Sequence, residues 1–280
     1  MSAPVLTLLY VPADRPDRVA KALASDADVV IVDLEDAVAP AHKDLAREQV
    51  VRLLGQVDRP VQVRVNHPAT AWHGADVEAV SALPPAVGLR APKVESAEEV
   101  RRLAALVPGR DLHLLVESAL GVERAFEIAT ASGEVATLGL GEADLRSDLR
   151  ITDDAGLAWV RSRIVNAARA ARLPSPAMSA YPNVRDLDGL VASCRAGRAL
   201  GFLGRSAIHP AQLAPIREAF RPTEADVEKA RAVVARVGQA RTEGVGAIAL
   251  PDGTFLDVAM VEQARAVLAV VERTRSVHRA

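Results

Sequence analysis

Acidic side chains recur at the ends of short apolar runs in this sequence. Asp33, Glu35 and Asp36 close one run, Glu117 closes another, and Asp144 follows a third. Carboxylates brought close together repel one another unless protons, cations or a metal ion compensate their charge. Two carboxylates with no cluster of cysteines or histidines form a ligand set for a hard divalent cation. Mg²⁺, which keeps waters or takes substrate oxygens, fits best.

Glu117 and Asp144 are the best-spaced pair for such a metal site, because they follow consecutive apolar runs at a matched depth. Each acid has an alternative role as a cap for the following helix, whose first backbone N–H groups lack partners. Capping accounts for a single acid more readily than for the pair. The sequence therefore predicts a Mg²⁺ site at Glu117 and Asp144.

Arg64 is the candidate for binding an anionic group. It follows an alternating apolar run and is expected to point toward the mouth formed by the strand ends. Its planar guanidinium fork matches the two oxygens of a carboxylate ligand. The alternative is an ion pair with a neighbouring acid, such as Glu35 or Asp36.

Other residues capable of chemistry receive a structural interpretation. His209 lies in a tight Ile-His-Pro corner, where a histidine more often makes structural hydrogen bonds than acts as a base. Cys194 falls inside the predicted helix 187–200 and is expected to pack there. Arg161 belongs to a set of arginines expected on the water-facing side of the predicted helix 157–171.

Eight short runs rich in Val, Ile and Leu predict the buried strands that position these residues. Amphipathic stretches between them, among them 42–54 and 157–171, predict helices. The predicted strands cover residues 5–10, 29–34, 61–65, 88–92, 112–116, 135–140, 176–180 and 201–208.

The alternation of continuous apolar strands with helices predicts an α/β fold in which helices cover a parallel sheet. Eight strands in 280 residues fit a (β/α)8 TIM barrel, which needs roughly 250 residues. An open doubly wound sheet is the rival fold. It is disfavoured because no glycine-rich phosphate-binding turn follows the first strand.

Residues 222–280 depart from this alternation. Pro222 opens a predicted helix, Asp252-Gly253 marks a turn, and a final amphipathic helix follows. We therefore predict two domains: a (β/α)8 barrel catalytic domain over 1–221, and a C-terminal helical lid or oligomerisation arm over 222–280.

The composition excludes several classes of protein. With 50% hydrophobic residues the chain is not generally disordered, and a formal charge of −2 argues against nucleic-acid binding driven by bulk charge. A single cysteine excludes an intrachain disulfide framework. The longest charge-free run, residues 1–13, is too short to cross a bilayer, and no basic stretch precedes it. We expect a soluble, cytoplasmic protein with no nucleic-acid or membrane partner.

An ordered set of short motifs makes the chain resemble the citrate lyase beta-subunit (CitE-like) family of the HpcH/HpaI aldolase superfamily. One such piece alone would be weak, but the ordered set spans nearly the whole chain. The matching pieces are residues 11–18, 33–38, 64–66, 92–95, 116–122, 141–145, 201–202, 208–210, 244–247 and 252–257.

This resemblance implies a Mg²⁺-dependent (β/α)8 barrel that cleaves or forms carbon–carbon bonds in short hydroxy-acyl-CoA thioesters such as malyl-CoA or citramalyl-CoA. It implies that Glu117 and Asp144 bind the metal and that Arg64 binds the substrate carboxylate. Glu35 and Asp36 would line the site and position metal-bound water.

The resemblance also places a catalytic acid, Asp257, on a lid that often reaches a neighbouring subunit's active site, in relatives that are commonly homotrimers. Asp257 would take the substrate hydroxyl proton. Lys93 is a candidate contact for the substrate, as are Arg15 and Arg18 for CoA. The expected partners are a CoA thioester or an α-keto or hydroxy acid, and further copies of this chain.

Three other functions stay open. The chain could be the beta subunit of a citrate lyase complex, acting on a citryl acyl-carrier-protein thioester. It could be a CoA-independent pyruvate-type aldolase, but that branch usually has a histidine base near the second strand, and His42 lies past the acidic motif. A non-catalytic scaffold is disfavoured because Arg64, Glu117, Asp144 and Asp257 occur together.

The chain departs from the family pattern at three places. Many relatives have a glutamate directly before the metal-binding aspartate, whereas here Ala143 stands there and Glu142 lies one place earlier. A glycine usually follows the position of Leu149, whereas here Arg150 does. The stretch 174–183 is rich in proline for a strand. These departures bear on the positioning of water and on substrate size.

Overall fold

The computed structural model describes residues 4–243, 248–249, 255–256 and 258–277. The chain divides into two compact units. One comprises Val5–Ala219, and the other comprises Met1–Pro4 together with Phe220–Ala280.

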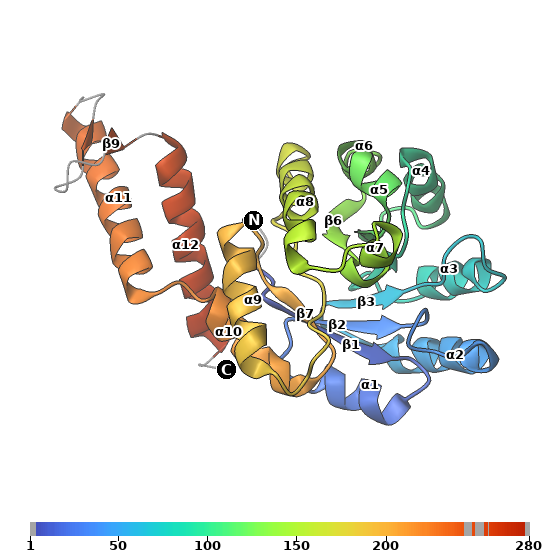
Figure 1. The fold of residues 1–280 in the computed structure, drawn as a ribbon. Coiled ribbons are helices and arrows are strands. Elements are labelled where there is room, and N and C mark those ends of the chain that lie inside the picture. Colours follow the sequence, from blue (N-terminus) through green and yellow to red (C-terminus); the bar gives the residue numbers. More distant parts are fainter. Residues whose placement is uncertain (1–3, 244–247, 250–254, 257, 278–280) are drawn as a thin grey trace. The chain divides into compact units, whose positions relative to one another are not determined.

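Within Val5–Ala219, the strands form one curled sheet in the order β6-β5-β4-β3-β2-β1-β7, in which neighbouring strands pair in parallel (Figure 1). All residues of β2 and β4 are buried, because these strands have partners on both sides and packing on both faces. The strands are β1 Thr7–Pro12, β2 Val29–Asp33, β3 Val61–Arg64, β4 Val87–Ala91, β5 Leu112–Val116, β6 Val135–Leu140 and β7 Arg205–Ala207. The predicted parallel α/β fold is confirmed, with seven of the eight expected strands among the described residues.

The prediction of a strand over 176–180 is wrong. This segment meets β7 through a single bridge, in which the Met178 N–H donates to Gly204 O and Met178 O accepts from the Ser206 N–H, both at 2.9 Å. On the other side, Ser179 Oγ donates to Leu140 O at 2.6 Å. Prolines flank the segment and lack the N–H that a strand ladder needs, so the pairing does not extend.

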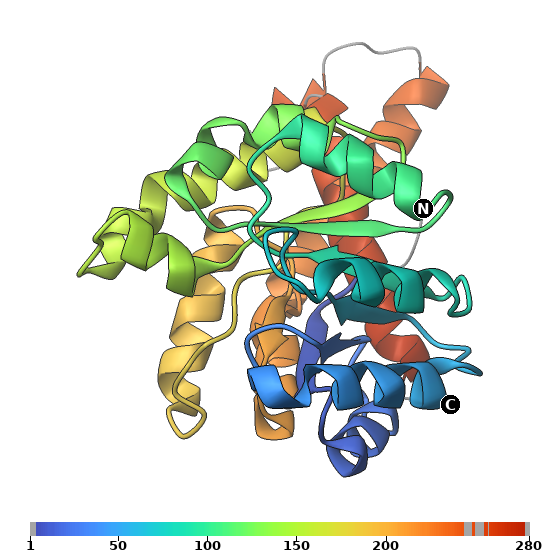
Figure 2. The same cartoon turned by 90° about the vertical axis from the view of Figure 1, so that its right-hand side faces the viewer.

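Helices follow the strands and lie on the outside of the curled sheet (Figure 2). The predicted helices 42–54, 157–171 and 187–200 are confirmed as α2, α8 and α9, with ends that differ by one residue. The helices of this unit are α1 Pro16–Leu23, α2 Lys43–Leu54, α3 His73–Ser81, α4 Ala97–Leu106, α5 Ala119–Glu123, α6 Ala125–Ala129, α7 Glu142–Asp148, α8 Ala158–Ala170, α9 Leu187–Ala199 and α10 Leu213–Phe220, with 3-10 turns η1 Pro40–His42, η2 Asp154–Leu157 and η3 Pro210–Gln212.

The helical periodicity explains how these helices dock. In α2, Ala46, Val50 and Leu54 are fully or almost fully buried, and they recur at four-residue spacing along one stripe. Leu45 and Val51 lie off that stripe and are exposed. The apolar stripe therefore fixes the orientation of α2, and with it the side from which Lys43 enters the protein.

Polar residues occupy part of the sheet face that carries the functional side chains. The register aligns Gln62 with Gly88 and Arg90 with His113, so these positions share one face of the sheet. A Cβ on Gly88 would lie 2.4 Å from His113 Nε2, so the glycine makes the space for the imidazole. His113 Nδ1 lies 2.9 Å from Thr137 Oγ1. The histidine thus packs against Gly88 and has the Thr137 hydroxyl as a hydrogen-bond partner.

We expect the stability of the protein to fall in mild acid because of His113. Burial, with a further contribution from Arg90, lowers the pKa of His113 to about 3, from 6.5 for a free imidazole. Below pH 6.5 the imidazole of His113 binds a proton in the unfolded chain but stays neutral in the folded chain, so stability is lost as the pH falls. At about 1.4 kcal/mol per pH unit, this loss reaches about 2 kcal/mol between pH 8 and pH 5.

Urea unfolding of the wild type and of His113→Gln at the two pH values measures this effect. The wild type should lose about 2 kcal/mol more than the variant on acidification. Equal pH dependence in the wild type and His113→Gln would show that His113 is not responsible.

The second unit is a helical hairpin. Helices α11 Glu224–Glu243 and α12 Val258–Val277 pack through Ala230, Val233, Val261 and Ala264. Strands β8 Ile248–Ala249 and β9 Phe255–Leu256 form a short antiparallel pair. Both predicted helices are confirmed, whereas the predicted turn at 252–253 lies outside the described residues. Among the helices described, none is long and apolar enough to span a membrane.

Candidate active site

The carboxyl ends of neighbouring strands bring the predicted site residues together. Arg64 is the last residue of β3, Glu35 lies just after β2, and Glu117 directly follows β5. Lys93 follows β4, and Asp144 lies in the first turn of α7 after β6. Because the strands are parallel, all of these positions lie at the same edge of the sheet.

Arg64 is surrounded by carboxylates. Its Nε and Nη2 donate to the two oxygens of Asp33 at 2.8 and 2.6 Å, which is a bidentate pair. Its Nη1 lies 2.7 Å from Glu35 Oε2, in an ion-pair contact without hydrogen-bond alignment, and 3.3 Å from Asp36 Oδ2. The Tyr10 ring packs against the guanidinium at 5.2 Å. The ion-pair alternative is thus realised, with Asp33 as the main partner.

Lys93 links the acids of three loops. Its ammonium contacts Glu35, lies 3.7 Å from Asp36 and lies 3.4 Å from Asp144. Its backbone N–H donates to Glu117 Oε2 at 2.9 Å. The residue has φ of 53°, a left-handed conformation that a non-glycine residue adopts at some energetic cost. Lys93 thus contacts Glu117 through its N–H and Glu35, Asp36 and Asp144 through its ammonium.

Glu117 is buried among other charged groups. The residue is only 5% exposed, and a Cβ on Gly141 would lie 1.9 Å from Glu117 Oε1, so the glycine makes room for the carboxylate. Burial raises the pKa of Glu117 to about 7, with further raising by Glu35 and Asp144 and partial opposition from Lys93 and Arg64. A cation placed beside a buried carboxylate stabilises its ionised form.

Burial and neighbouring charges also shift the pKa values of Glu35, Arg64 and Lys93. Burial raises the pKa of Glu35, against the effects of Arg64 and Lys93. Burial alone would lower the pKa values of Arg64 and Lys93, but Asp33 acting on Arg64 and Glu35 acting on Lys93 outweigh it, so both pKa values are raised. Both cations therefore stay charged throughout the ordinary pH range.

The donor set fits a hard divalent cation. Among the described residues, no three His, Cys, Asp or Glu side chains gather as a complete ligand set. Glu117 accepts from the Lys93 backbone N–H, and Asp144 lies 3.4 Å from the Lys93 ammonium. The charge of Asp144 contributes to raising the pKa of Glu117, so the two carboxylates lie within electrostatic reach of each other. A hard cation can complete its shell with water and substrate oxygens. Burial, with the charges of Glu35 and Asp144, raises the pKa of Glu117, and a nearby cation would favour its ionised form.

Two departures from the family pattern find a structural explanation. Glu142 points away from the site and accepts from Arg161 Nε and Nη2 at 2.8 and 2.7 Å. Arg161 also donates to Asp154. The expectation that Arg161 faces water is wrong, since it is 7% exposed and held by these two acids. Arg150 has φ of 54°, the conformation that a glycine would adopt without strain.

His209 and Cys194 have the structural roles expected of them. His209 Nδ1 accepts the Ala211 N–H at 3.2 Å and caps η3, and Gln212 completes the capping box. Cys194 is fully buried in α9, in contact with Arg205. The partners of both residues lie outside the acidic cluster.

Four further residues were singled out in the sequence. His42 is exposed and pairs with Asp14, which is not one of the clustered acids. Arg15 and Arg18 are exposed. Asp257 lies outside the described residues.

The sequence analysis assigned no role to three residues that support the site. Asp33 is buried and holds Arg64, and it was visible as the first acid of the Asp-Leu-Glu-Asp motif. Asn66 is buried and donates to Leu34 O at 3.0 Å. Lys43, at the start of α2, is 5% exposed. No pattern in the sequence distinguishes Lys43 from a solvated lysine at a helix terminus.

Comparison with known proteins agrees with this geometry. Residues 6–210 match the model of the HpcH/HpaI aldolase/citrate lyase family. The citrate lyase subunit beta of Leuconostoc mesenteroides subsp. cremoris is 33% identical over 279 residues, which cover 94% of this chain and 91% of the relative. The (3S)-malyl-CoA thioesterase of Cereibacter sphaeroides strain ATCC 17025 is 36% identical over 275 residues, with coverage of 96% and 95%.

A solved structure resembles the whole chain. It is that of the protein CitE from Mycobacterium tuberculosis in complex with magnesium, acetoacetate and coenzyme A. Its TM-score is 0.81 at 34% sequence identity, and the match covers 96% of this chain and 98% of that one.

Proposed function

Because this chain belongs to the HpcH/HpaI aldolase/citrate lyase family, we propose that it is a Mg²⁺-dependent carbon–carbon lyase acting on a short hydroxy-acyl-CoA thioester such as malyl-CoA or citramalyl-CoA. One observation carries the proposal. At the strand ends, Lys93 contacts Glu117 through its backbone N–H and Asp144 through its ammonium, and Glu35 joins Lys93 to the Arg64 guanidinium. Relatives that act on citrate or on malyl-CoA, and a similar structure that holds magnesium and coenzyme A, supply the class of substrate.

The reaction requires removal of a hydroxyl proton and stabilisation of an enolate. In our proposal Glu117 and Asp144 hold Mg²⁺, which when bound supplies a Lewis acid and a template for the hydroxy acid. Arg64 lies beside this place and would balance the negative charge of the substrate carboxylate and of the fragment that leaves. Glu35 and Asp36, held by Arg64 and Lys93, would orient water around the site.

The remaining parts of the proposal concern assembly. The segment 176–180 bonds to β7 on one side and to β6 on the other, and we propose that it stands in for the eighth strand of a closed (β/α)8 barrel. Residues 1–221 would form the catalytic domain and 222–280 the lid. Asp257 on the lid would take the hydroxyl proton. A homotrimer, working in the cytoplasm, is the proposed form of the protein.

A turnover screen by mass spectrometry tests the function. Purified protein with Mg²⁺ is incubated with malyl-CoA, citramalyl-CoA and 3-hydroxy-3-methylglutaryl-CoA, with EDTA as a control. We expect EDTA-sensitive release of acetyl-CoA with an α-keto acid from malyl-CoA or citramalyl-CoA. Release of free CoA with the intact hydroxy acid would instead show thioester hydrolysis, the activity named for the relative from Cereibacter sphaeroides.

Absence of turnover on all three thioesters would contradict the proposal. Activity on a citryl acyl-carrier-protein thioester would then identify a citrate lyase subunit. Metal-dependent cleavage of a free hydroxy-keto acid would identify a pyruvate-type aldolase. Inactivity in every assay would leave the non-catalytic scaffold.

A further inference from the structure

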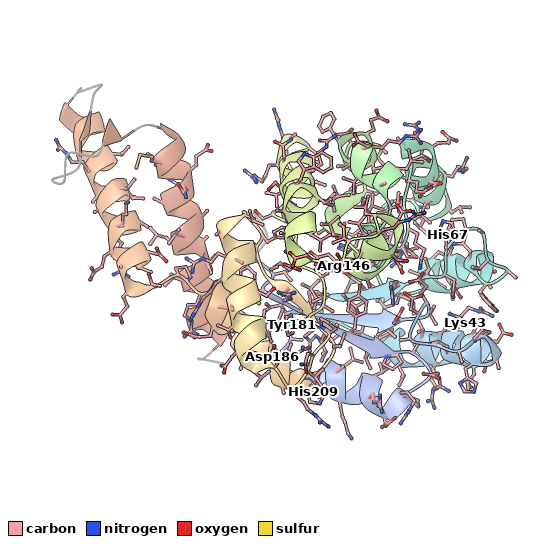
Figure 3. The ribbon with its side chains drawn as sticks, viewed as in Figure 1. Lys43, His67, Arg146, Tyr181, Asp186 and His209 are labelled. Atoms are coloured by element: carbon pink, nitrogen blue, oxygen red, sulfur yellow. The ribbon has the colours of Figure 1, made fainter. Side chains whose placement is uncertain are left out.

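Lys43 is a buried cation with a full set of hydrogen bonds. Its ammonium donates to Leu34 O at 2.6 Å, to Glu35 O at 2.7 Å and to Asn66 Oδ1 at 2.8 Å. The Trp72 ring packs over it at 5.4 Å. Lys43 lies in the first turn of α2 and is labelled beside that helix in Figure 3. An ammonium has three donors, so all of them are directed at the loop after β2 and at its support.

The support for Lys43 is itself anchored. Asn66 Nδ2 donates to Asp76 Oδ2 at 2.6 Å, and the Asn66 N–H donates to the same oxygen at 3.0 Å. Asp76 is fully buried and accepts from Arg47 Nη1 at 3.1 Å. Because Asn66 follows β3 and Asp76 lies in α3, these contacts tie the loop after β2 to the next strand and helix.

Two arginines hold backbone carbonyls in the same manner at the opposite edge of the sheet. Arg110 donates to carbonyls between the end of α3 and the start of β4, at Ser81, Leu83, Pro84 and Val87. Arg59 donates to carbonyls before β2, at Leu23, Ser25 and Ala27. Those loops carry none of the clustered acids. Lys43 differs in that the loop it holds includes Glu35.

We propose that Lys43 is a positioning residue for the reaction: by fixing the backbone of Leu34 and Glu35, it aims the Glu35 carboxylate at Arg64 and Lys93. Glu35 reaches both cations from this loop, with Oε2 at 2.7 Å from Arg64 Nη1 and Oε1 in contact with the Lys93 ammonium. If the loop moved, both contacts would be lost together. This inference rests on the proposed function for its effect on turnover.

Lys43→Met removes the three donors while keeping most of the side-chain volume. We expect kcat to fall about 100-fold, the scale of loss from a small misplacement of a reacting group, with a smaller change in KM. Combined with Glu35→Gln, it should cause no further loss beyond that of Glu35→Gln alone, because Lys43 acts through Glu35. Lys43→Arg keeps the charge but cannot direct three donors at one point, so it should restore only part of kcat.

Arg110→Met is the matched control, because it removes a cation that holds carbonyls away from the site. It should lower thermal stability while kcat stays close to the wild-type value. Two results would overturn the inference. One is a double variant whose loss of kcat equals the product of the losses in Lys43→Met and Glu35→Gln. The other is a Lys43→Met variant with the kcat of the wild type.

Amide hydrogen exchange supplies a readout that does not depend on turnover. The N–H groups of Glu35 and Ala37 donate to Asp33, so this loop should be protected in the wild type. Lys43→Met should speed exchange over residues 34–38, whereas Arg110→Met should speed it over 81–87 only. A wild type without turnover would contradict the proposed function alone, and unchanged exchange over 34–38 in a folded Lys43→Met would contradict the role of Lys43.

Discussion

We expect the joint replacement of Glu117 by glutamine and Asp144 by asparagine to abolish Mg²⁺ binding and to lower turnover on the order of 10³-fold. In the proposed function these two carboxylates are the metal ligands, and amides cannot supply the charge that holds a hard divalent cation. A bound metal contributes several kcal/mol to stabilising the charge of the transition state, and each 1.4 kcal/mol is a factor of about ten in rate. Losing it therefore removes most of the catalysis.

Calorimetric titration with Mg²⁺ and the EDTA-controlled turnover assay measure the two effects separately. Glu123→Gln and Glu127→Gln, two exposed acids on α5 and α6, form the matched control and should change neither. Residual Mg²⁺ affinity equal to that of the wild type in the Glu117 and Asp144 double variant would show that the metal site lies elsewhere.

Arg64→Met should destabilise the protein by about 3–5 kcal/mol and abolish turnover. The change leaves Asp33 and Glu35, which are 1% and 6% exposed, without their main counter-charge, and a buried ion pair that loses one partner costs about this much. Arg64→Lys keeps the charge but loses the bidentate contact with Asp33, so it should retain more of the stability than Arg64→Met and remain poorly active.

Urea unfolding at pH 7.5 with parallel turnover assays tests this prediction. Arg101→Met is the control, because Arg101 is exposed and meets only Glu98, at 3.5 Å, so its loss should cost well under 1 kcal/mol. A loss of turnover with unchanged stability would mean that Arg64 serves the substrate and that its contacts with Asp33 and Glu35 contribute little. Unchanged stability and turnover would remove Arg64 from the site.

Much of the fold could be predicted from local pattern. The runs that became β5 and β6 have the predicted bounds, because buried parallel strands are continuous apolar segments with clear ends. The prediction of a strand over 176–180 is wrong because it relied on the alternation of strands and helices. It gave too little weight to the prolines, which remove backbone donors. In α8, the apolar stripe was found but Arg161 was misplaced, since its acidic partners come from α7 and η2.

In the candidate site, too, the positions of residues could be predicted from the sequence, but their partners could not. The positions of Glu117, Asp144, Arg64 and Lys93 at one sheet edge follow from the order of strands and loops, which the sequence displays. Their partners do not follow from it. Arg64 is paired with Asp33 across 31 residues, and Lys93 meets Glu35 across 58 residues.

The sequence by itself thus determined the alternation of strands and helices and the residues that stand at the strand ends, because periodicity and strand termini are local properties of the chain. Only the tertiary structure decided which charges pair, that Glu142 serves Arg161 and not the site, and that Lys43 holds the loop of Glu35. Those outcomes depend on burial and on contacts between residues far apart in sequence. The energy of a charge is set by what surrounds it after folding, and not by its neighbours along the chain.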